Sequence, residues 1–342
     1  MAKKAIGTQS VKFEKPPVIL EASSIVGKKE GEGPFGKYFD RILSDHLLGE
    51  DSWEKAEQHL QKDTAKMLMD KLGPFQNKIR YVVAGDLLGQ LMASSFGTMD
   101  YKIPLFGVYG ACSTMGESLG LAAALVDGGY ADAVMALTSS HFASAEKQFR
   151  FPLGYSNQRP KAATWTVTGS GAVCLADPDC VEPGKGMARV VGMTTGKVTD
   201  YGVKDNMNMG ACMAPAAADV IYHHLEDFGT KPQEYDRIVT GDLGLVGKDI
   251  LIDLMRARGY DISKQYMDCG VEIFGEGQNV QAGGSGCGCS AVMLTGFMLK
   301  ELQKNHWKRI LFVPTGALIS PVSFNEGDSV PGIAHGVVLE AI

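Results

Sequence analysis

The chain has 342 residues, of which 45% are apolar and 21% charged, so it is typical of a folded globular protein and disorder is excluded as its main state. Its 39 acidic residues outnumber 33 basic ones, giving a net charge of −6, and we expect no nucleic acid partner. No apolar run is long enough to span a membrane, and the first residues lack the apolar core of a secretory signal. The seven cysteines form no regular disulfide framework, so we expect reduced thiols.

The first half of the chain is expected to alternate strands and helices. Apolar runs bounded by small or turn residues predict the strands, and apolar spacing along one face predicts the helices. The expected elements are a strand at 18–27, a loop with one short helix around 38–48, a helix at 53–72, a strand ending at 82–87, a buried strand at 103–108, a helix beginning near residue 112, and strands at 131–137 and 171–175.

The second half repeats this pattern weakly but in the same order. Ile-Val-Thr-Gly-Asp-Leu at 238–243 repeats Val-Val-Ala-Gly-Asp-Leu at 82–87, and the glycine-rich stretch 283–287 corresponds to 109–113. The expected elements are strands at 190–198, 237–240, 309–314 and 336–340, a helix at 214–228 and a loop at 315–335. The repeat is too long for a solenoid and indicates two duplicated α/β halves, residues 1–183 and 184–342, each with a largely parallel sheet.

Cys112 is expected at the start of a helix, directly after a strand and a turn of small residues. Free amides and the helix dipole at such a position favour a thiolate, which suits a nucleophile. A small buried cysteine that fills space behind a tight turn explains the same spacing equally well.

The sequence YGACSTMGESLGLAAALVDGGYADAVMA at 109–136 resembles the nucleophile segment of condensing enzymes of the thiolase-like superfamily. WTVTGSGAV at 165–173 is similar to a glycine-rich turn of that superfamily, and the likeness covers essentially the whole chain. The resemblance implies an α/β, thiolase-like fold with two duplicated halves in a layered αβαβα arrangement. It also implies a homodimer.

The catalytic partners that the resemblance implies for Cys112 are missing. Ketoacyl-synthase-like enzymes pair this cysteine with a His and with an Asn or a second His. The first partner should follow the strand at 237–240, where this chain has Asp242, and the second should lie at 282–286, which reads Ala-Gly-Gly-Ser-Gly. An ionised Asp242 cannot donate to an oxyanion, and its charge raises the pKa of a nearby thiol. We therefore expect Cys112 to be a vestigial nucleophile in a pocket that binds and does not catalyse.

Two further segments, VKFEKPPVILEASSIVGKKEGEGPFGKYFD at 11–40 and GDLGLVGKDIL at 241–251, are similar to a family of sporulation proteins from spore-forming bacteria. This resemblance implies a binding protein for dipicolinic acid (pyridine-2,6-dicarboxylate) or its calcium chelate. It implies a peripheral position at the forespore or spore inner membrane, beside the other membrane proteins of an assembly that moves the ligand into the forespore. No cofactor is implied.

A flat aromatic dianion requires cationic or amide donors and an apolar wall. His141, Arg159 and Lys161 are candidate donors, although a hydrogen-bonded histidine and a solvated basic loop explain them as well. Helix-start amides attract carboxylates without a charged side chain. The candidate ligand-binding residues are Cys112, His141, Arg159, Lys161, Asp242, Gly284, Ser285 and Gly286.

No metal site is expected, because Cys287 and Cys289 lack a second ligand pair and no EF-hand loop is present. Two other functions remain open from the sequence. The retained Cys112 segment permits a residual acyltransferase or thioesterase of the condensing-enzyme type. A scaffold for membrane proteins, without a ligand, is the third interpretation.

Overall fold

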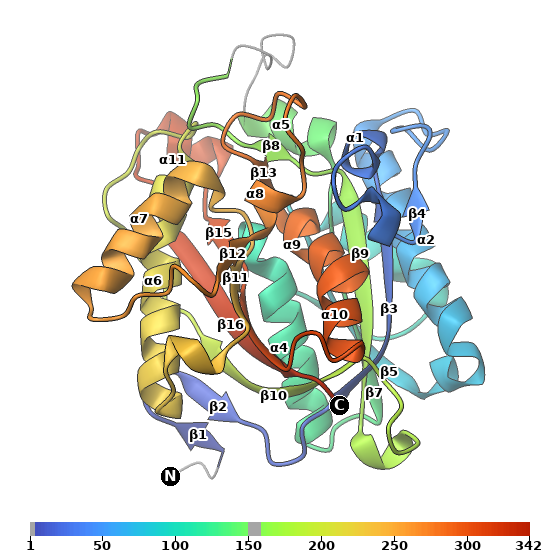
Figure 1. Cartoon of the computed structure of the whole chain (residues 1–342). Coiled ribbons are helices and arrows are strands. Elements are labelled where there is room, and N and C mark those ends of the chain that lie inside the picture. Colours follow the sequence, from blue (N-terminus) through green and yellow to red (C-terminus); the bar gives the residue numbers. More distant parts are fainter. Residues whose placement is uncertain (1–3, 150–158) are drawn as a thin grey trace.

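The computed structural model describes residues 4–149 and 159–342, and ten strands form the main path of one continuous sheet (Figure 1). The strands of the first half are β3 (Val18–Val26), β5 (Ile79–Asp86), β6 (Leu105–Gly107), β7 (Ala133–Ser140) and β9 (Gly169–Ala176). Those of the second half are β10 (Ala188–Thr195), β11 (Arg237–Thr240), β12 (Tyr266–Asp268), β14 (Arg309–Val313) and β16 (Gly332–Glu340). The short strands are β1 (Ala5–Ile6), β2 (Ser10–Lys12), β4 (Arg41–Ile42), β8 (Trp165–Thr166), β13 (Gly284–Ser285) and β15 (Thr315–Ala317).

The strand order mirrors itself about the contact between β10 and β3. It runs β12-β11-β14-β16-β10 and then β3-β9-β7-β5-β6, so each half uses its first, fifth, fourth, second and third strands in the same order outward from the centre. The duplicated Gly-Asp-Leu sequences occupy equivalent places, at the ends of β5 and β11. Each half is mixed, because β9 and β3, like β16 and β10, pair antiparallel. The expectation of largely parallel sheets was therefore right only for the outer strands.

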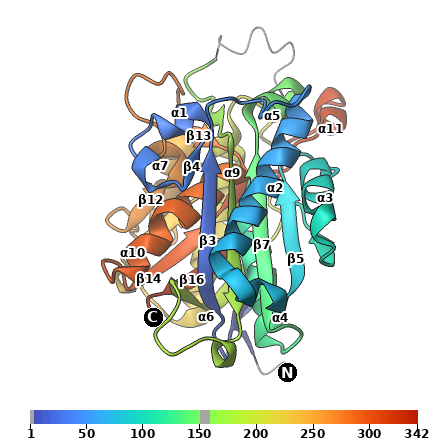
Figure 2. The ribbon, with the colours of Figure 1, turned by 90° about the vertical axis from the view of Figure 1, so that its right-hand side faces the viewer.

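Helices fill the layers around the two halves of the sheet (Figures 1 and 2). Helices α4 and α9 lie in the middle, α2 and α3 cover the first half, and α6 and α7 cover the second. This is the layered αβαβα arrangement. The helices are α1 (Lys28–Gly31), α2 (Trp53–Leu72), α3 (Met92–Thr98), α4 (Thr114–Asp127), α5 (Phe142–Phe149), α6 (Met209–Phe228), α7 (Gly244–Ala257), α8 (Cys269–Glu272), α9 (Cys287–Met293), the π-helical turn Leu294–Met298, α10 (Leu299–Gln303) and α11 (Pro321–Asn325).

Three local expectations were wrong. The strand at 103–108 is not buried: β6 is the outermost strand, and Leu105 and Phe106 are exposed. An apolar sequence cannot distinguish a central strand from an edge strand that keeps its apolar side chains. No helix spans 38–48, where Asp45 accepts hydrogen bonds from the following turn. The stretch 315–335 is not one loop, because it contains β15 and α11.

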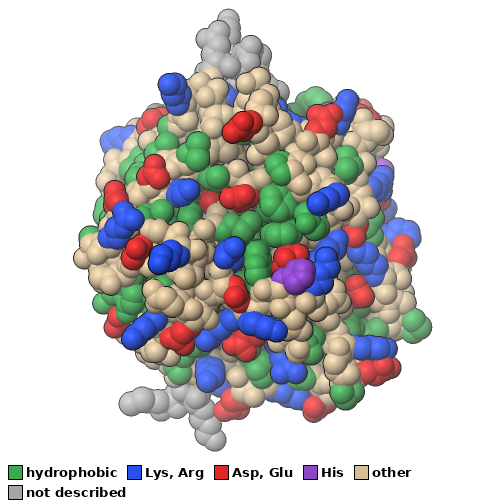
Figure 3. Space-filling model, viewed as in Figure 1, with side chains coloured by type: hydrophobic (Ala, Val, Ile, Leu, Met, Phe, Trp, Pro, Cys, Tyr) green, Lys and Arg blue, Asp and Glu red, His purple; other side chains and the backbone are tan. Residues whose placement is uncertain are grey.

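Within the described residues, no helix combines the length and apolar character needed to cross a bilayer. On the face shown in Figure 3, side chains of both charges are interspersed, and no extended basic patch is visible.

Gly316 is predicted to hold β15 against the turn before Cys112. A Cβ atom at Gly316 would lie 2.1 Å from the Gly110 carbonyl oxygen and 3.1 Å from the Ser113 nitrogen. Because these are backbone atoms, they cannot rotate away. We expect Gly316→Ala to lower the free energy of unfolding by about 1–3 kcal/mol in urea denaturation. Gly89→Ala is the control, since its nearest neighbour would be 4.0 Å away, and an equal loss in both variants would contradict this account.

Candidate functional site

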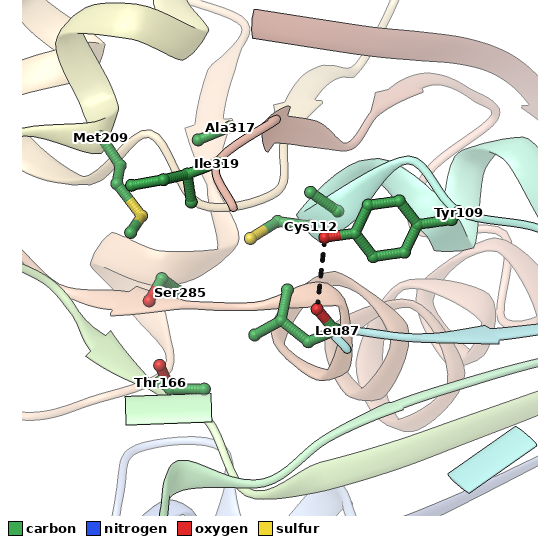
Figure 4. A pocket seen from close by; sticks show the side chains of 9 residues that line it. Leu87, Tyr109, Cys112, Thr166, Met209, Ser285, Ala317 and Ile319 are labelled. Carbon is green, nitrogen blue, oxygen red and sulfur yellow. Dashed lines mark hydrogen bonds between the residues drawn. The ribbon is translucent and has the colours of Figure 1, made fainter. Parts of the chain in front are cut away.

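A narrow cavity lies against the sulfur of Cys112, where the two halves of the protein meet (Figure 4). Its volume is about 10 Å³, room for little more than one water molecule. Figure 4 shows Tyr109 and Leu87 on one side of the cysteine and Met209 and Ile319 on the other. The lining residues are Leu87, Tyr109, Ala111, Cys112, Thr166, Met209, Ser285, Ala317 and Ile319. The wall is thus largely apolar with a few polar groups.

The polar side of the cavity is built by two short strands. β13 pairs with β8 in parallel, which sets Ser285 beside Thr166. The next residue, Gly286, has φ +97°, and a Cβ atom there would lie 2.7 Å from the Ser140 hydroxyl oxygen, so only glycine fits. Gly284 is buried among Ile273, Phe274 and Val167 and does not line the cavity.

Asp242 lies directly behind Cys112 and is fully buried. Its carboxylate accepts hydrogen bonds from the Gly286 amide at 2.9 Å, the Thr315 hydroxyl at 2.8 Å and the Cys112 thiol. Burial raises the pKa of Asp242 to about 7, even though these three hydrogen bonds lower it. The Gly286 amide also acts on the Cys112 thiol, whose pKa it lowers, so Asp242 and Cys112 share this one donor.

The thiol of Cys112 is held in its protonated form. It stands in a short 3₁₀ turn (Ala111–Ser113) just before α4, as expected. However, burial and then the charge of Asp242 raise the pKa of this thiol well above its ordinary value. The expectation that the helix start favours a thiolate was wrong, because desolvation and the carboxylate outweigh the helix dipole.

A wider cleft of about 570 Å³ adjoins the cavity. The two spaces share Leu87, Tyr109 and Ile319 as lining residues, and the Tyr109 hydroxyl donates to the Leu87 carbonyl oxygen at 3.4 Å. Figure 4 shows this bond across the edge of the cavity. These three side chains therefore separate the sulfur of Cys112 from the cleft.

Amide and hydroxyl groups line the cleft, together with one acid. Gln90, Gln148 and Ser320 contribute the neutral polar groups, and Glu54, which pairs with Lys147, contributes the acid. A molecule the size of a substituted pyridine fits the cleft, whereas the inner cavity is too small for one.

His141 lies away from the cavity. Its Nε2 atom bonds the His46 carbonyl oxygen at 2.9 Å, Nδ1 accepts from the Ala143 amide at 3.2 Å, and the ring packs 5.5 Å from Trp53. Burial lowers the pKa of His141. The geometry is that of a hydrogen-bonded core histidine, one of the two interpretations that the sequence left open.

Arg159 and Lys161 do not line the cavity either. The guanidinium of Arg159 is buried, lies 3.0 Å from the Glu146 carboxylate and donates to the Thr164 carbonyl oxygen at 2.5 Å. It also lies over the ring of Trp165, at 4.6 Å. Lys161 is exposed to solvent. Of the candidate ligand-binding residues, the structure places Cys112, Asp242, Ser285 and Gly286 together.

A second group of buried acids was not predicted. Glu57 accepts from the Ser139 hydroxyl at 2.9 Å and the Ser144 hydroxyl at 2.6 Å, and Asp86 accepts from the Ser94 hydroxyl at 2.7 Å. Burial, then the neighbouring Asp86, raises the pKa of Glu57 to about 8. The available signal was the Asp of the repeated Gly-Asp-Leu sequence, whose second copy supplies Asp242. Within the described residues, no group of three or more His, Cys, Asp or Glu side chains could hold a metal ion.

Solved structures of similar shape are thiolases and related condensing enzymes. Acat5 thiolase from Ascaris suum, in complex with coenzyme A, is 14% identical with a TM-score of 0.60, covering 96% of this chain and all of that one (100%). The dimeric peroxisomal thiolase of Saccharomyces cerevisiae is 13% identical with a TM-score of 0.58 (96% and 98% covered), and 3-oxoacyl-[acyl-carrier-protein] synthase III from Aquifex aeolicus VF5 is 13% identical with a TM-score of 0.56 (95% and 99% covered). The protein has a thiolase-like fold.

The sequence is more specific than the fold. The family described as stage V sporulation protein AD matches residues 7–340. Stage V sporulation protein AD of Bacillus subtilis (strain 168) is 41% identical over 337 residues, covering 98% of both chains. The chain belongs to the stage V sporulation protein AD family, which gives it a role in sporulation.

The protonated, enclosed thiol of Cys112 is predicted to react slowly. Burial leaves Cys180 as the only cysteine of the seven that is partly exposed. We expect iodoacetamide at pH 7.5 to modify the folded protein once, at Cys180, as measured by intact mass and peptide mapping. The variant Cys180→Ser should then stay unmodified on the same timescale. Rapid alkylation of Cys112 in that variant would mean that the thiol is activated after all.

Proposed function

We propose that this protein is a non-enzymatic binding protein for dipicolinic acid or its calcium chelate, acting in the assembly that moves this ligand into the forespore. Membership of a stage V sporulation family supports the role. The observation that carries the non-enzymatic part is the hydrogen bond between Cys112 and Asp242. Asp242 stands after the strand at 237–240, where a condensing enzyme has its catalytic histidine.

Catalysis by Cys112 would need a thiolate and donors for an oxyanion. Asp242 opposes the formation of the thiolate, and its carboxylate shares with the Cys112 sulfur the hydrogen bond that the Gly286 amide donates. The remaining polar groups of the cavity wall are the neutral hydroxyls of Tyr109, Thr166 and Ser285. These groups suit the binding of a small molecule better than acyl transfer.

The cleft, and not the inner cavity, has room for a pyridine dicarboxylate. Leu87, Tyr109 and Ile319 offer it an apolar wall, and the amides of Gln90 and Gln148 offer neutral donors to its carboxylates. The ligand reaches Cys112 only when the three shared side chains move apart.

Isothermal titration with pyridine-2,6-dicarboxylate, alone and with equimolar calcium, tests this proposal. We expect saturable binding of one ligand per chain. Gly89 lines the cleft with open space beside it, so Gly89→Phe should fill the cleft and weaken binding about tenfold or more. Gly275→Phe, at a similarly open glycine outside the cleft, should leave binding unchanged.

The absence of heat at millimolar ligand, for protein that is folded by circular dichroism, would reject the proposed ligand. Equal weakening by both phenylalanine variants would place the binding site elsewhere. If no pocket variant affected either binding or ligand uptake by sporulating cells, the scaffold interpretation would replace this one.

We also propose that two copies pair through β6. Its outer edge has no partner strand within the described residues, and exposed apolar side chains surround it: Phe96, Met99, Leu105 and Phe106. An exposed, apolar strand edge favours pairing with another chain. Attachment to the membrane would come from the other proteins of the assembly.

The variant Phe106→Asp is expected to convert the dimer into a monomer, because it buries a charge in the proposed contact. Size-exclusion chromatography with light scattering measures the mass. Val322→Asp, which alters a still more exposed apolar residue on α11, should remain dimeric. A monomeric parent protein, or a dimeric Phe106→Asp variant, would contradict pairing through β6.

A further inference from the structure

Three buried carboxyl groups, Asp242, Asp86 and Glu57, gather behind the wall of the Cys112 cavity. Each is fully excluded from solvent. Asp242 bonds the thiol of Cys112, and Asp86 directly precedes Leu87, whose side chain lines both cavity and cleft. All three also act electrostatically on the thiol of Cys287, which packs with Cys112. The acids come from both halves of the protein.

The groups that face Asp242 are neutral or acidic. They are the Cys112 thiol, the Gly286 amide from the start of α9, the Thr315 hydroxyl from β15 and, from the end of β12, the carboxyl of Asp268. The charge of Asp242 also acts on the buried thiols of Cys212, Cys269, Cys287 and Cys289. Within residues 4–149 and 159–342, no Lys, Arg or His side chain pairs with Asp242. Its charge is therefore compensated by hydrogen bonds alone.

The same holds for the other two acids. Glu57 faces the Ser139 and Ser144 hydroxyls, with Asp86 and Glu54 as the nearest charges. Asp86 faces the backbone amides of Leu88 and Ser94 and the Ser94 hydroxyl. No cation of the described chain pairs with either acid. The basic residues that the sequence suggested for a ligand carboxylate lie elsewhere, so this pocket is acidic and not basic.

Buried acids and an anionic ligand repel each other, so binding requires that one of the negative charges is neutralised. Burial already raises the pKa of Asp242 to about 7, so near neutral pH a fraction of the molecules carry a proton there. A second negative charge within one side chain of Asp242, in a region of low dielectric, favours the protonated acid further. Protonation of Asp242 from solvent costs less free energy than leaving its carboxylate beside a ligand carboxylate.

We propose that the protein takes up one proton at Asp242 when a dicarboxylate enters the cleft and reaches the Cys112 wall. The inference rests on the proposed function, because it concerns the same pocket. The balance is simple: the dianion and one proton from solvent enter together, the Asp242 carboxylate becomes a carboxylic acid, and no covalent bond of the ligand changes. The site thereby couples its affinity to pH.

The pH dependence has a definite sign. Below pH ~7 Asp242 is already protonated in the unbound protein, so binding takes up no proton and the affinity is constant. Above that pH the binding reaction takes up a proton whose concentration in solution falls tenfold per pH unit. Kd should therefore rise by up to about tenfold per pH unit. The ligand itself stays fully ionised over this window, so it contributes no slope.

Titration calorimetry of the unmodified protein in phosphate and in Tris at pH 8 measures the proton directly, because the two buffers have very different heats of ionisation. We expect an uptake approaching one proton per ligand, and a Kd that weakens from pH 7 to pH 8.5. Asp242→Asn should abolish both effects. Glu30→Gln is the matched control: Glu30 is equally buried, burial raises its pKa to about 7, and it contacts the backbone of Thr168 without lining the pocket.

A neutral analogue, pyridine-2,6-dicarboxamide, supplies a second control that needs no variant. If it binds, it should do so without proton uptake, and uptake with this ligand would contradict the electrostatic cause. Dicarboxylate binding with heat that is independent of the buffer would overturn the coupling while leaving the proposed function intact. Absence of dicarboxylate binding in every buffer would instead reject the proposed function. Uptake that persists in a folded Asp242→Asn protein would exclude Asp242 as the proton site.

Discussion

The structure of the site depends on one buried carboxylate. Asp242 joins the Cys112 thiol from the first half, the Gly286 amide before α9 and the Thr315 hydroxyl on β15. A carboxylate without these donors would be too costly to bury, and the donors without the carboxylate would be unsatisfied. The three segments therefore keep their places together.

The internal repeat places one acid in each half, Asp86 in the first and Asp242 in the second, and the two acids have different hydrogen-bond partners. At the end of β5, Asp86 holds the turn that leads into α3, through Leu88 and Ser94. At the end of β11, Asp242 reaches across to the other half. The two positions are topologically equivalent, and the charges of both acids act on the thiol of Cys287. The clustering of acids around Cys112 and Cys287 thus follows from duplication of a single Gly-Asp-Leu sequence.

Much of the fold could be predicted, because the apolar periodicity indicates the helices and strands and the internal repeat indicates the two halves. The helix expected at 53–72 is α2, with the same bounds, and the strands expected near residues 171–175 and 309–314 are β9 and β14. The exposure of β6 could not be predicted, since an edge strand differs from a central one only in what lies beside it.

The candidate site was predicted in part, for a related reason. Cys112, Asp242 and Ser285 stand at ends of elements that meet at one place, and spacing reveals such ends. Arg159 carries a charge that suits an anion, but its partner Glu146 is set by the packing of α5 against β8, which the sequence does not express. The apolar residues that separate the cavity from the cleft, such as Tyr109, carry no chemical signal at all.

A single side chain, Asp242, therefore governs the protonation of the Cys112 thiol on this fold. Each unit by which the pKa of a thiol exceeds the ambient pH reduces the thiolate tenfold, which is about 1.4 kcal/mol of lost driving force. Asp242 acts in the direction opposite to an imidazolium, which would stabilise the thiolate and donate to an oxyanion. Keeping Cys112 as a small neutral donor is then the consistent outcome, because a thiol satisfies the buried acid that a larger side chain would displace. In this structure Cys112 is a hydrogen-bond partner of Asp242, and that bond alone is enough to hold the side chain in its position.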